Sequence, residues 1–206
     1  MPDHAIPGLT PRNQPVGPLA APGDYNVTLS VNGQKYSQPI KVLPDPRVHI
    51  AQADFDEQLA WAQKAVNGLA VSFDAFHQIA SLRHEIDGRM KELASAQGAE
   101  SLIAGLRSLD AQSGNLADGT RQSPGVGTAN RDLARYFAMI ESGDMRPSES
   151  AKKAVQDSCT QLGRNLTSWR DWNGNLLAGL NSQLAARSLA ALPAAPNIPV
   201  DSPCGK

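Results

Sequence analysis

Aromatic residues are scarce in this chain and make up 5% of its 206 residues. A core with so few rings is thin, which favours a helical bundle over a broad-cored enzyme fold. The sequence also lacks any run of about 18 apolar residues, so it predicts no segment that spans a bilayer. Lysine and arginine form no cluster and the formal net charge is −1. A nucleic-acid partner is therefore not expected, because phosphate binding draws on a basic face.

Cysteine is nearly absent as well, and the only two are Cys159 and Cys204. Two states fit the sequence: a disulfide in an oxidising compartment, or a buried thiol together with a second thiol in a disordered tail. Cys159 lies in an apolar helical repeat, which indicates a structural side chain and not a nucleophile. Serine-hydrolase motifs of the form G-x-S-x-G and Walker-type phosphate loops are both missing. The sequence therefore assigns no catalytic residue, no metal ligand and no cofactor.

Proline is absent from residues 51–97, which contain only two glycines. Between Phe55 and Leu93 the apolar side chains recur every three or four residues, so they share one stripe of an α-helix. A helix of this length cannot bury its stripe against itself. The sequence therefore predicts partner helices later in the chain.

Three further helices and a short final one are predicted after the long helix. They lie at residues 100–110, 129–142 and 148–172, and around Leu176, Leu180 and Leu184. Residues 113–128 contain four glycines and one proline, which predicts a flexible loop. The predicted fold class is mainly α, an antiparallel bundle of three to four helices with one very long member. We expect the first and fourth helices to run antiparallel, with the third helix in their groove.

The clearest local signal is Asn32-Gly33, the preferred pair for a two-residue type I′ turn. It predicts a β-hairpin in which residues 24–31 pair with residues 34–42 and Pro39 lies opposite Asn26. One face of this hairpin collects the apolar side chains of Tyr25, Val27, Leu29, Val31, Tyr36, Ile40 and Val42. We expect that face to be covered, which makes the hairpin half-buried with one solvated side.

Pro39 indicates that the second strand is a sheet edge, because the donor that proline lacks would point away from the first strand. Further strands can therefore join only beside residues 24–31. An isolated two-stranded hairpin is marginal in water. The proline-rich lead-in before it offers at most one more short strand, near residues 16–21. We interpret the hairpin as an incomplete β-unit.

The hairpin and the junction after it carry a family resemblance. The segments concerned read APGDYNVTL at residues 21–29, NGQKYSQP at 32–39 and DPRV at 45–48, and the long amphipathic helix follows. Together they resemble the C-terminal region of bacterial sortilin-like proteins with BNR/Asp-box β-propellers, some of which carry a glycosyl hydrolase label. In that family a propeller precedes a small Ig-like β-unit and a helical tail. The resemblance covers about residues 17–192, and the sequence contains no S-x-D-x-G-x-T-W Asp-box.

The predicted organisation is a lead-in with a partial Ig-like unit at residues 1–46, a helical bundle at 47–192 and a disordered tail at 193–206. The resemblance implies a non-catalytic accessory module that packs against a β-propeller or another protein. It also implies an extracytoplasmic location, periplasmic or secreted, although residues 1–18 lack the layout of a signal peptide.

Two alternative functions stay open. A hydrolase of the glycosidase type predicts a pocket with at least two convergent ionisable groups, beneath a folded loop at residues 113–128. A self-associating helical protein predicts a homodimer. Each alternative makes a structural demand that differs from that of an accessory module.

Three aromatic residues are candidates for an interface, namely Tyr25 and Tyr36 on the hairpin and Trp172 near the end of the fourth helix. The long helix also carries a polar stripe made of Asp74, His77, Ser81, His84 and Asp87. The spacing Asp74-x-x-His77 occurs in carboxylate-bridged metal bundles, but those sites need matching carboxylates that face inward from other helices. We interpret the stripe as a solvated face.

Overall fold

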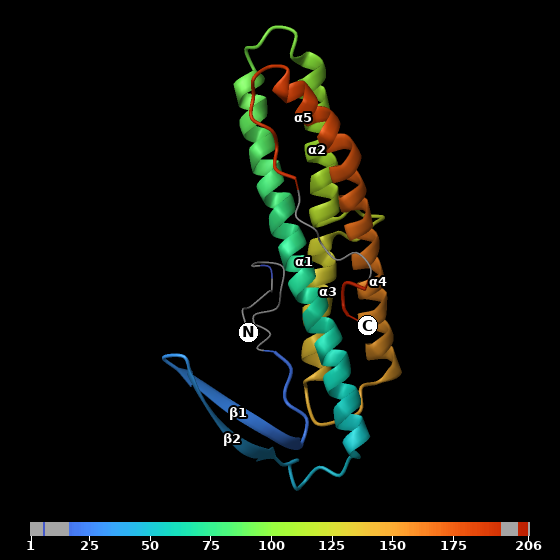
Figure 1. Ribbon diagram of the computed structural model, residues 1–206. Helices are drawn as coiled ribbons and strands as arrows, with labels where there is room; N and C mark the ends of the chain where they lie inside the picture. The colour runs from blue at the N-terminus through green and yellow to red at the C-terminus, as the bar shows by residue number, and fades with distance from the viewer. Residues whose placement is uncertain (1–5, 7–16, 195–201, 206) are drawn as a thin grey trace.

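The computed structural model describes Ile6, residues 17–194 and residues 202–205. The chain forms an elongated, mainly helical bundle with one very long helix and a small N-terminal hairpin, which confirms the predicted fold class (Figure 1). The elements are β1 (Gly23–Val31), β2 (Gln34–Val42), α1 (Gln52–Leu93), α2 (Glu100–Asp118), α3 (Val126–Ile140), α4 (Glu149–Trp172), the π-helical turn η1 (Asn173–Leu177) and α5 (Ala178–Ala185).

The helices form three rods that run up, down and up (Figure 1). The first rod is α1, the second is α2 followed by α3, and the third is α4, η1 and α5. An ion pair of 2.6 Å between Lys152 Nζ and Glu57 Oε1 joins the N-terminal parts of α4 and α1, which both start at the same end of the bundle (Figure 1). The first and fourth helices are therefore parallel, and the expectation that they run antiparallel is wrong. The reason is that α2 and α3 together carry the chain back only once, so α4 starts at the same end as α1.

The predicted stripe of α1 is the centre of the core. This helix has 42 residues, and its buried apolar side chains are Phe55, Ala62, Ala65, Val66, Leu69, Ala75, Ile79, Leu82, Ile86 and Leu93. One buried polar side chain interrupts them near the start. Gln58 Nε2 donates to the carbonyl oxygens of Ile140 and Gly143 at 2.7 and 2.8 Å. These bonds tie the start of α1 to the end of α3.

A second buried polar cluster lies between α1 and α3. Asn130 is fully buried, and its Nδ2 donates to Ser72 Oγ at 2.9 Å and to Leu69 O at 3.3 Å. Its Oδ1 accepts a hydrogen bond of 3.2 Å from the Ile6 amide. A buried amide is costly unless it is hydrogen-bonded. The cluster therefore selects one register of α3 on α1 and binds Ile6 to the bundle.

The prediction of a flexible loop at residues 113–128 is wrong. The helices α2 and α3 extend into this stretch from both sides, and a tight turn with a Gly119–Pro124 bridge joins them. Gly119 has a φ of 86°, and a Cβ there would lie 2.5 Å from the amide nitrogen of Gly125. Glycine is needed here because a side chain would be strained and would collide with the backbone. The glycines that predict a loop therefore serve a close turn between two helices.

The third rod stays helical through Asn173-Gly174, where the sequence predicts a break. The chain makes the wide turn η1 there and continues directly into α5. A π-helical turn holds more residues than an α-helical one, so the buried position moves on by one residue. Leu177 is 2% exposed, whereas the predicted core residue Leu176 is 44% exposed. Leu180 and Leu184 are buried as predicted.

The end of the chain is joined to the bundle by a disulfide between Cys159 and Cys204. Of the two states that the sequence leaves open, the paired one is present. Cys204 is 4% exposed, and its carbonyl oxygen accepts a hydrogen bond of 3.4 Å from Asn67 Nδ2. Pairing with α4 and burial against α1 therefore hold Cys204, which lies in the predicted tail, on the bundle. Of the predicted tail at residues 193–206, residues 195–201 and 206 lie outside the described part of the chain.

The hairpin has the predicted register, with Asn26 opposite Pro39. Asn32 and Gly33 have φ angles of 49° and 82°, as a type I′ turn requires. The two strands are the only sheet in the part of the chain that the structure describes. Residues 17–21 form no strand, so the short strand that the lead-in could offer is not found there, and residue 16 lies outside the described part.

Candidate interaction surface

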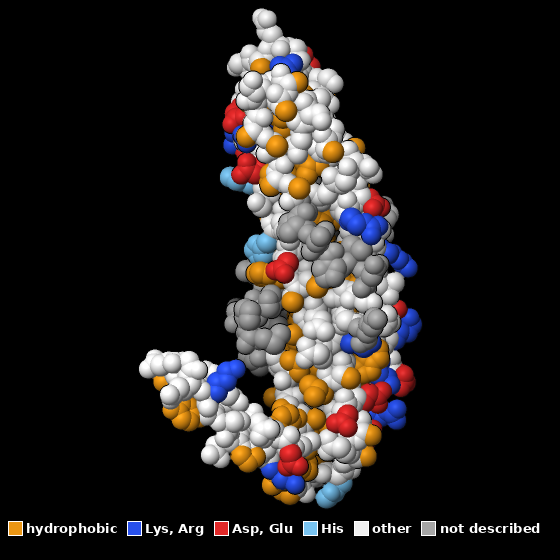
Figure 2. Space-filling view, in the orientation of Figure 1, with side chains coloured by type: hydrophobic (Ala, Val, Ile, Leu, Met, Phe, Trp, Pro, Cys, Tyr) orange, Lys and Arg blue, Asp and Glu red, His pale blue; other side chains and the backbone are white. Residues whose placement is uncertain are grey.

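The hairpin projects from one end of the bundle as an arm (Figures 1 and 2). We call one side of it the apolar hairpin face, defined by Tyr25, Val27, Leu29, Val31, Tyr36 and Ile40. The exposed fractions are 60% for Leu29, 57% for Tyr36 and 52% for Val27. The expectation of a half-buried hairpin is therefore wrong. The reason is that the strands extend away from α1, so no described helix packs on this face.

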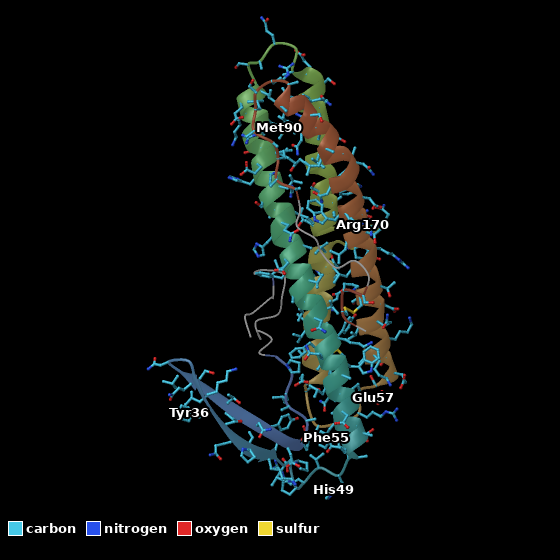
Figure 3. The ribbon with its side chains drawn as sticks, viewed as in Figure 1. Tyr36, His49, Phe55, Glu57, Met90 and Arg170 are labelled. Atoms are coloured by element: carbon cyan, nitrogen blue, oxygen red, sulfur yellow. A yellow bond between two sulfur atoms is a disulfide. The ribbon has the colours of Figure 1, made fainter. Side chains whose placement is uncertain are left out.

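The interface candidates from the sequence fall in two places. Tyr36 lies on the projecting part of the arm, and its hydroxyl donates to Gln34 Oε1 at 2.7 Å (Figure 3). Tyr25 is half-buried nearer the base and donates to the Ala21 carbonyl oxygen at 2.6 Å. Trp172 is half-buried against the helical core at the end of α4. The structure thus places the two tyrosines on one face and puts Trp172 on a separate rod.

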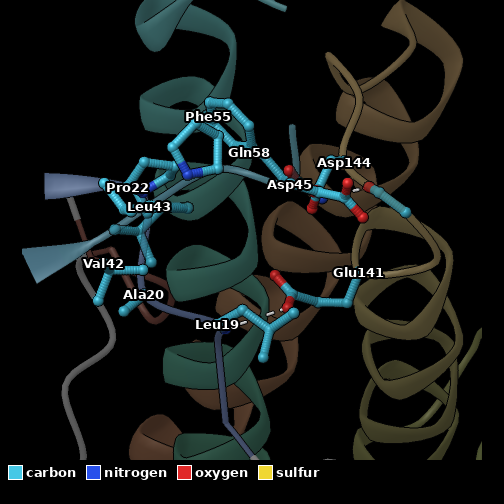
Figure 4. A pocket seen from close by; sticks show the side chains of 14 residues that line it. Leu19, Ala20, Pro22, Val42, Leu43, Asp45, Phe55, Gln58, Glu141 and Asp144 are labelled. Carbon is cyan, nitrogen blue, oxygen red and sulfur yellow. Dashed lines mark hydrogen bonds between the residues drawn. The ribbon is translucent and has the colours of Figure 1, made fainter. Parts of the chain in front are cut away.

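Two exposed leucines beside the hairpin were not singled out by sequence reasoning. Leu19 is 63% exposed and Leu43 is 70% exposed, and they lie just before β1 and just after β2. They belong to proline-rich segments without periodicity, so no pattern in the sequence marks them. The structure brings both to the base of the arm, where they extend the exposed apolar surface toward the bundle (Figure 4).

A cleft of about 370 Å³ lies where the base of the hairpin meets the bundle (Figure 4). Leu19, Leu43 and Phe55 form part of its apolar wall, and Glu141 and Asp144 supply carboxylates. Glu141 Oε2 accepts a hydrogen bond of 3.0 Å from the Leu19 amide. Burial raises the pKa of Glu141, the negative charge of Asp144 adds to this, and the bond from Leu19 opposes it. The cleft therefore lies at the joint, the region where the arm meets α1 and α3.

Asp45 also lines this cleft, and its pKa is shifted in the opposite direction. The side chain of Arg47 donates to both carboxylate oxygens, from Nε at 3.0 Å and from Nη2 at 2.6 Å. These hydrogen bonds lower the pKa of Asp45. Carboxyl groups with opposed shifts are the pattern of an acid–base pair, but Arg47 engages both oxygens of Asp45. This carboxylate is therefore not free to act as a base.

The hydrolase alternative places residues 113–128 over a pocket of ionisable groups. These residues are the end of α2, the tight turn and the start of α3, and none of them lines the cleft. The cleft is lined instead by residues that flank the hairpin and by the ends of α1 and α3. The structural demand of the hydrolase alternative is not met at this cleft.

The polar stripe of α1 has the surroundings of a solvent-facing surface. All five of its residues, Asp74, His77, Ser81, His84 and Asp87, are exposed, in agreement with the solvated-face interpretation. The His77 ring packs beside Phe73, with centroids 4.3 Å apart. Among the described residues, no three His, Cys, Asp or Glu side chains converge as metal ligands would.

A second apolar feature lies between the end of α3 and the start of α4. It is a cavity of about 520 Å³ lined by Met139, Met145 and Pro147, with Arg135 and Arg146 beside them. Met139 and Met145 are 55% and 52% exposed. Sequence reasoning missed this groove because its residues belong to a helix end and a connection, which share no periodic pattern.

Comparisons with protein-family models, with curated proteins and with solved structures find no match. The propeller resemblance therefore rests on the three hairpin and junction segments and the long helix after them. As for membranes, none of the described helices combines the length and the apolar character that a crossing requires.

Proposed function

We propose that this chain is a non-catalytic accessory module that docks onto a protein partner through the apolar hairpin face. The observation that carries the proposal is the exposure of five neighbouring apolar side chains on an arm held clear of the bundle. Single apolar side chains on a surface are ordinary, whereas contiguous ones mark interaction sites. The propeller resemblance favours a β-propeller domain as the partner.

The arm is held in place for such a role. The hydroxyl of Tyr25 bonds the chain just before β1, and Gln52 Nε2 of α1 donates to Pro22 O at 2.9 Å. The Leu19 amide is bound by Glu141 at the end of α3. A surface that is ordered before binding loses less entropy when a partner arrives. The bundle therefore acts as a rigid base for a preformed docking surface.

The size of the apolar hairpin face limits what it can achieve alone. Five of its side chains, Val27, Leu29, Val31, Tyr36 and Ile40, keep roughly half of their surface exposed. Covering them contributes on the order of 1 kcal/mol each, or about 5 kcal/mol in total. Association costs about 4–15 kcal/mol. A partner therefore needs further contacts beyond the apolar face.

The proposal is tested by mixing the purified chain with a β-propeller domain expressed separately from the same genome. Calorimetry and size-exclusion chromatography should detect a complex with the wild-type chain. Leu29→Glu places a charge on the apolar hairpin face and should weaken binding at least about tenfold. Thr28→Glu is the matched control, because it adds the same charge to the opposite face of the same strand.

Two results would count against the proposal. One is the absence of any complex between the wild-type chain and the propeller domain. The other is an equal loss of binding in both variants, which would mean that the apolar face has no special part in it. Thermal unfolding of both variants checks that the bundle is intact.

A further inference from the structure

The geometry points to β1 as the strand to which the partner adds a strand of its own: the partner is a β-sheet protein that extends the hairpin at β1 and covers the apolar hairpin face. This inference rests on the proposed function and specifies its contact. It follows from a difference between the two edges of the hairpin.

The outer edge of β2 is blocked. Val31 and Gln34 flank the two-residue turn and form a hydrogen-bonded pair, and such pairs alternate with non-hydrogen-bonded ones along the ladder. Pro39 falls at a non-hydrogen-bonded position opposite Asn26, so its nitrogen faces outward. Proline has no amide proton to give to an added strand. An incoming strand therefore meets an interruption in the middle of β2.

Within the described residues, no strand pairs with the outer edge of β1. The same alternation turns the amides and carbonyls of Asp24, Asn26, Thr28 and Ser30 outward. In the described part of the chain, β2 is the only strand that pairs with β1. The outward groups of β1 are therefore available to a strand from another molecule.

The two strands also differ in the residues that protect sheet edges. Natural proteins guard exposed edges with proline and lysine. β2 reads QKYSQPIKV and contains Pro39, Lys35 and Lys41, whereas β1 reads GDYNVTLSV and contains neither residue type. Only one of the two edges is protected against pairing. An edge left open beside an exposed apolar face is suited to strand addition, in which backbone bonds supply affinity and side chains supply specificity.

A partner sheet suits this site better than a second copy of the chain does. If two copies paired β1 to β1, the two-fold axis would stand perpendicular to the shared sheet. Both apolar hairpin faces would then lie on the same side of it and stay uncovered. Strand pairing alone would also bury less than the roughly 1,200 Å² typical of stable interfaces. A partner that pairs with β1 and packs a second sheet about 10 Å above the hairpin covers both features.

The test uses the full chain, labelled for NMR, and a synthetic strand peptide. The peptide has nine residues, the length of β1. It has a lysine at each end, and valine and threonine alternate between them. On addition of the peptide at millimolar concentration, the amides of Asn26, Thr28 and Ser30 should exchange with solvent at least about tenfold more slowly. The outward amides of Ser37 and Lys41 on β2 should be unaffected.

Two proline variants form a matched pair. Thr28 and Ser37 face each other at a non-hydrogen-bonded position, so each proline removes one outward amide and the same 3.3 Å side-chain hydrogen bond. In Thr28→Pro the peptide should no longer protect the β1 amides. In Ser37→Pro it should still protect them. Protection of the Val31 and Gln34 amides reports whether the hairpin itself is intact in each variant.

Several results would overturn the inference. They are protection on β2, no protection on either strand, an equal effect of the two prolines, or a concentration-dependent dimer of the chain that Thr28→Pro removes. The peptide can fail to protect β1 while the propeller domain still binds and Leu29→Glu still weakens that binding. This result would mean that the partner docks on the apolar hairpin face without adding a strand, and it leaves the proposed function intact. Protection by the peptide without any propeller complex would mean that β1 accepts an added strand but that the propeller domain is not the partner.

Discussion

The disulfide between Cys159 and Cys204 should supply a large share of the stability of this bundle. The two cysteines are 45 residues apart, so the bond closes a long loop in the unfolded chain. The entropy removed from the unfolded state by a loop of this length corresponds to about 4 kcal/mol at 25 °C. Marginal domains have a total stability of about 5–15 kcal/mol. The double variant Cys159→Ser with Cys204→Ser is therefore expected to lose roughly 3–4 kcal/mol.

A neighbouring glycine links this effect to the packing of the bundle. A Cβ on Gly68 would lie 2.6 Å from Cys204 Sγ and 2.7 Å from Leu133 Cδ1. Gly68→Ala should therefore destabilise the oxidised chain by about 1–3 kcal/mol through overpacking. When Cys204 is replaced and its segment is free to move, only the contact with Leu133 stays. The cost of Gly68→Ala should then fall by at least about 0.5 kcal/mol, a coupling typical of residues in contact.

Urea unfolding followed by far-UV circular dichroism measures these differences. The oxidised wild-type chain, the same chain in reductant and the cysteine variants would be compared at equal protein concentration. Thiol titration of the denatured, unreduced chain should find no free cysteine. A loss of stability below about 1 kcal/mol on removal of both cysteines would refute the loop-closure reasoning. Equal costs of Gly68→Ala with and without Cys204 would refute the packing reasoning.

Three further predictions concern the core, the joint and the tight turn. Asn130→Ala removes the buried hydrogen bonds that Asn130 makes to Ser72 Oγ, to the Leu69 carbonyl oxygen and to the Ile6 amide, so it should lower the free energy of unfolding by about 2–3 kcal/mol, measured in urea. Burial raises the pKa of Glu141 above its ordinary value of 4.5, so its charge destabilises the native state at neutral pH and this cost is lost as the pH falls to about 4.5. Glu141→Gln should therefore raise the thermal midpoint at about pH 7 and change it least at about pH 4. A difference in midpoint between variant and wild type that stays constant with pH would contradict this. Gly119→Ala strains a positive φ and brings a Cβ within 2.5 Å of the Gly125 nitrogen, so it should cost at least about 2 kcal/mol, whereas a neutral effect in urea would mean that the turn relaxes.

The helices could be predicted from the sequence because their stripes are local patterns. The buried residues Val155, Cys159, Leu162, Leu166 and Trp169 of α4 follow the spacing of three and four that defines one face of a helix. Ser148 caps this helix by accepting a hydrogen bond of 3.2 Å from the Ala151 amide, and serine is among the residues preferred at this position. Each feature depends on residues within one or two turns of each other.

The candidate surface could be predicted only in part. Alternation along the hairpin places Tyr25 and Tyr36 on one face, because the turn at Asn32-Gly33 sets the register. That this face is exposed depends on where the hairpin points relative to α1, and no local pattern encodes that direction. The contributions of Leu19 and Leu43 depend on the same placement.

By itself, the sequence determined the centres of the helices, most of the residues in their apolar stripes, and how the two strands pair. These properties follow from backbone geometry and from spacings of a few residues. Only the tertiary structure decided that α1 and α4 run parallel, that Gly119 closes a tight turn, that Cys204 reaches Cys159 and that the apolar hairpin face is uncovered. These properties depend on which distant surfaces meet. Several packings bury the same stripes, and the close fit of whole side chains selects among them.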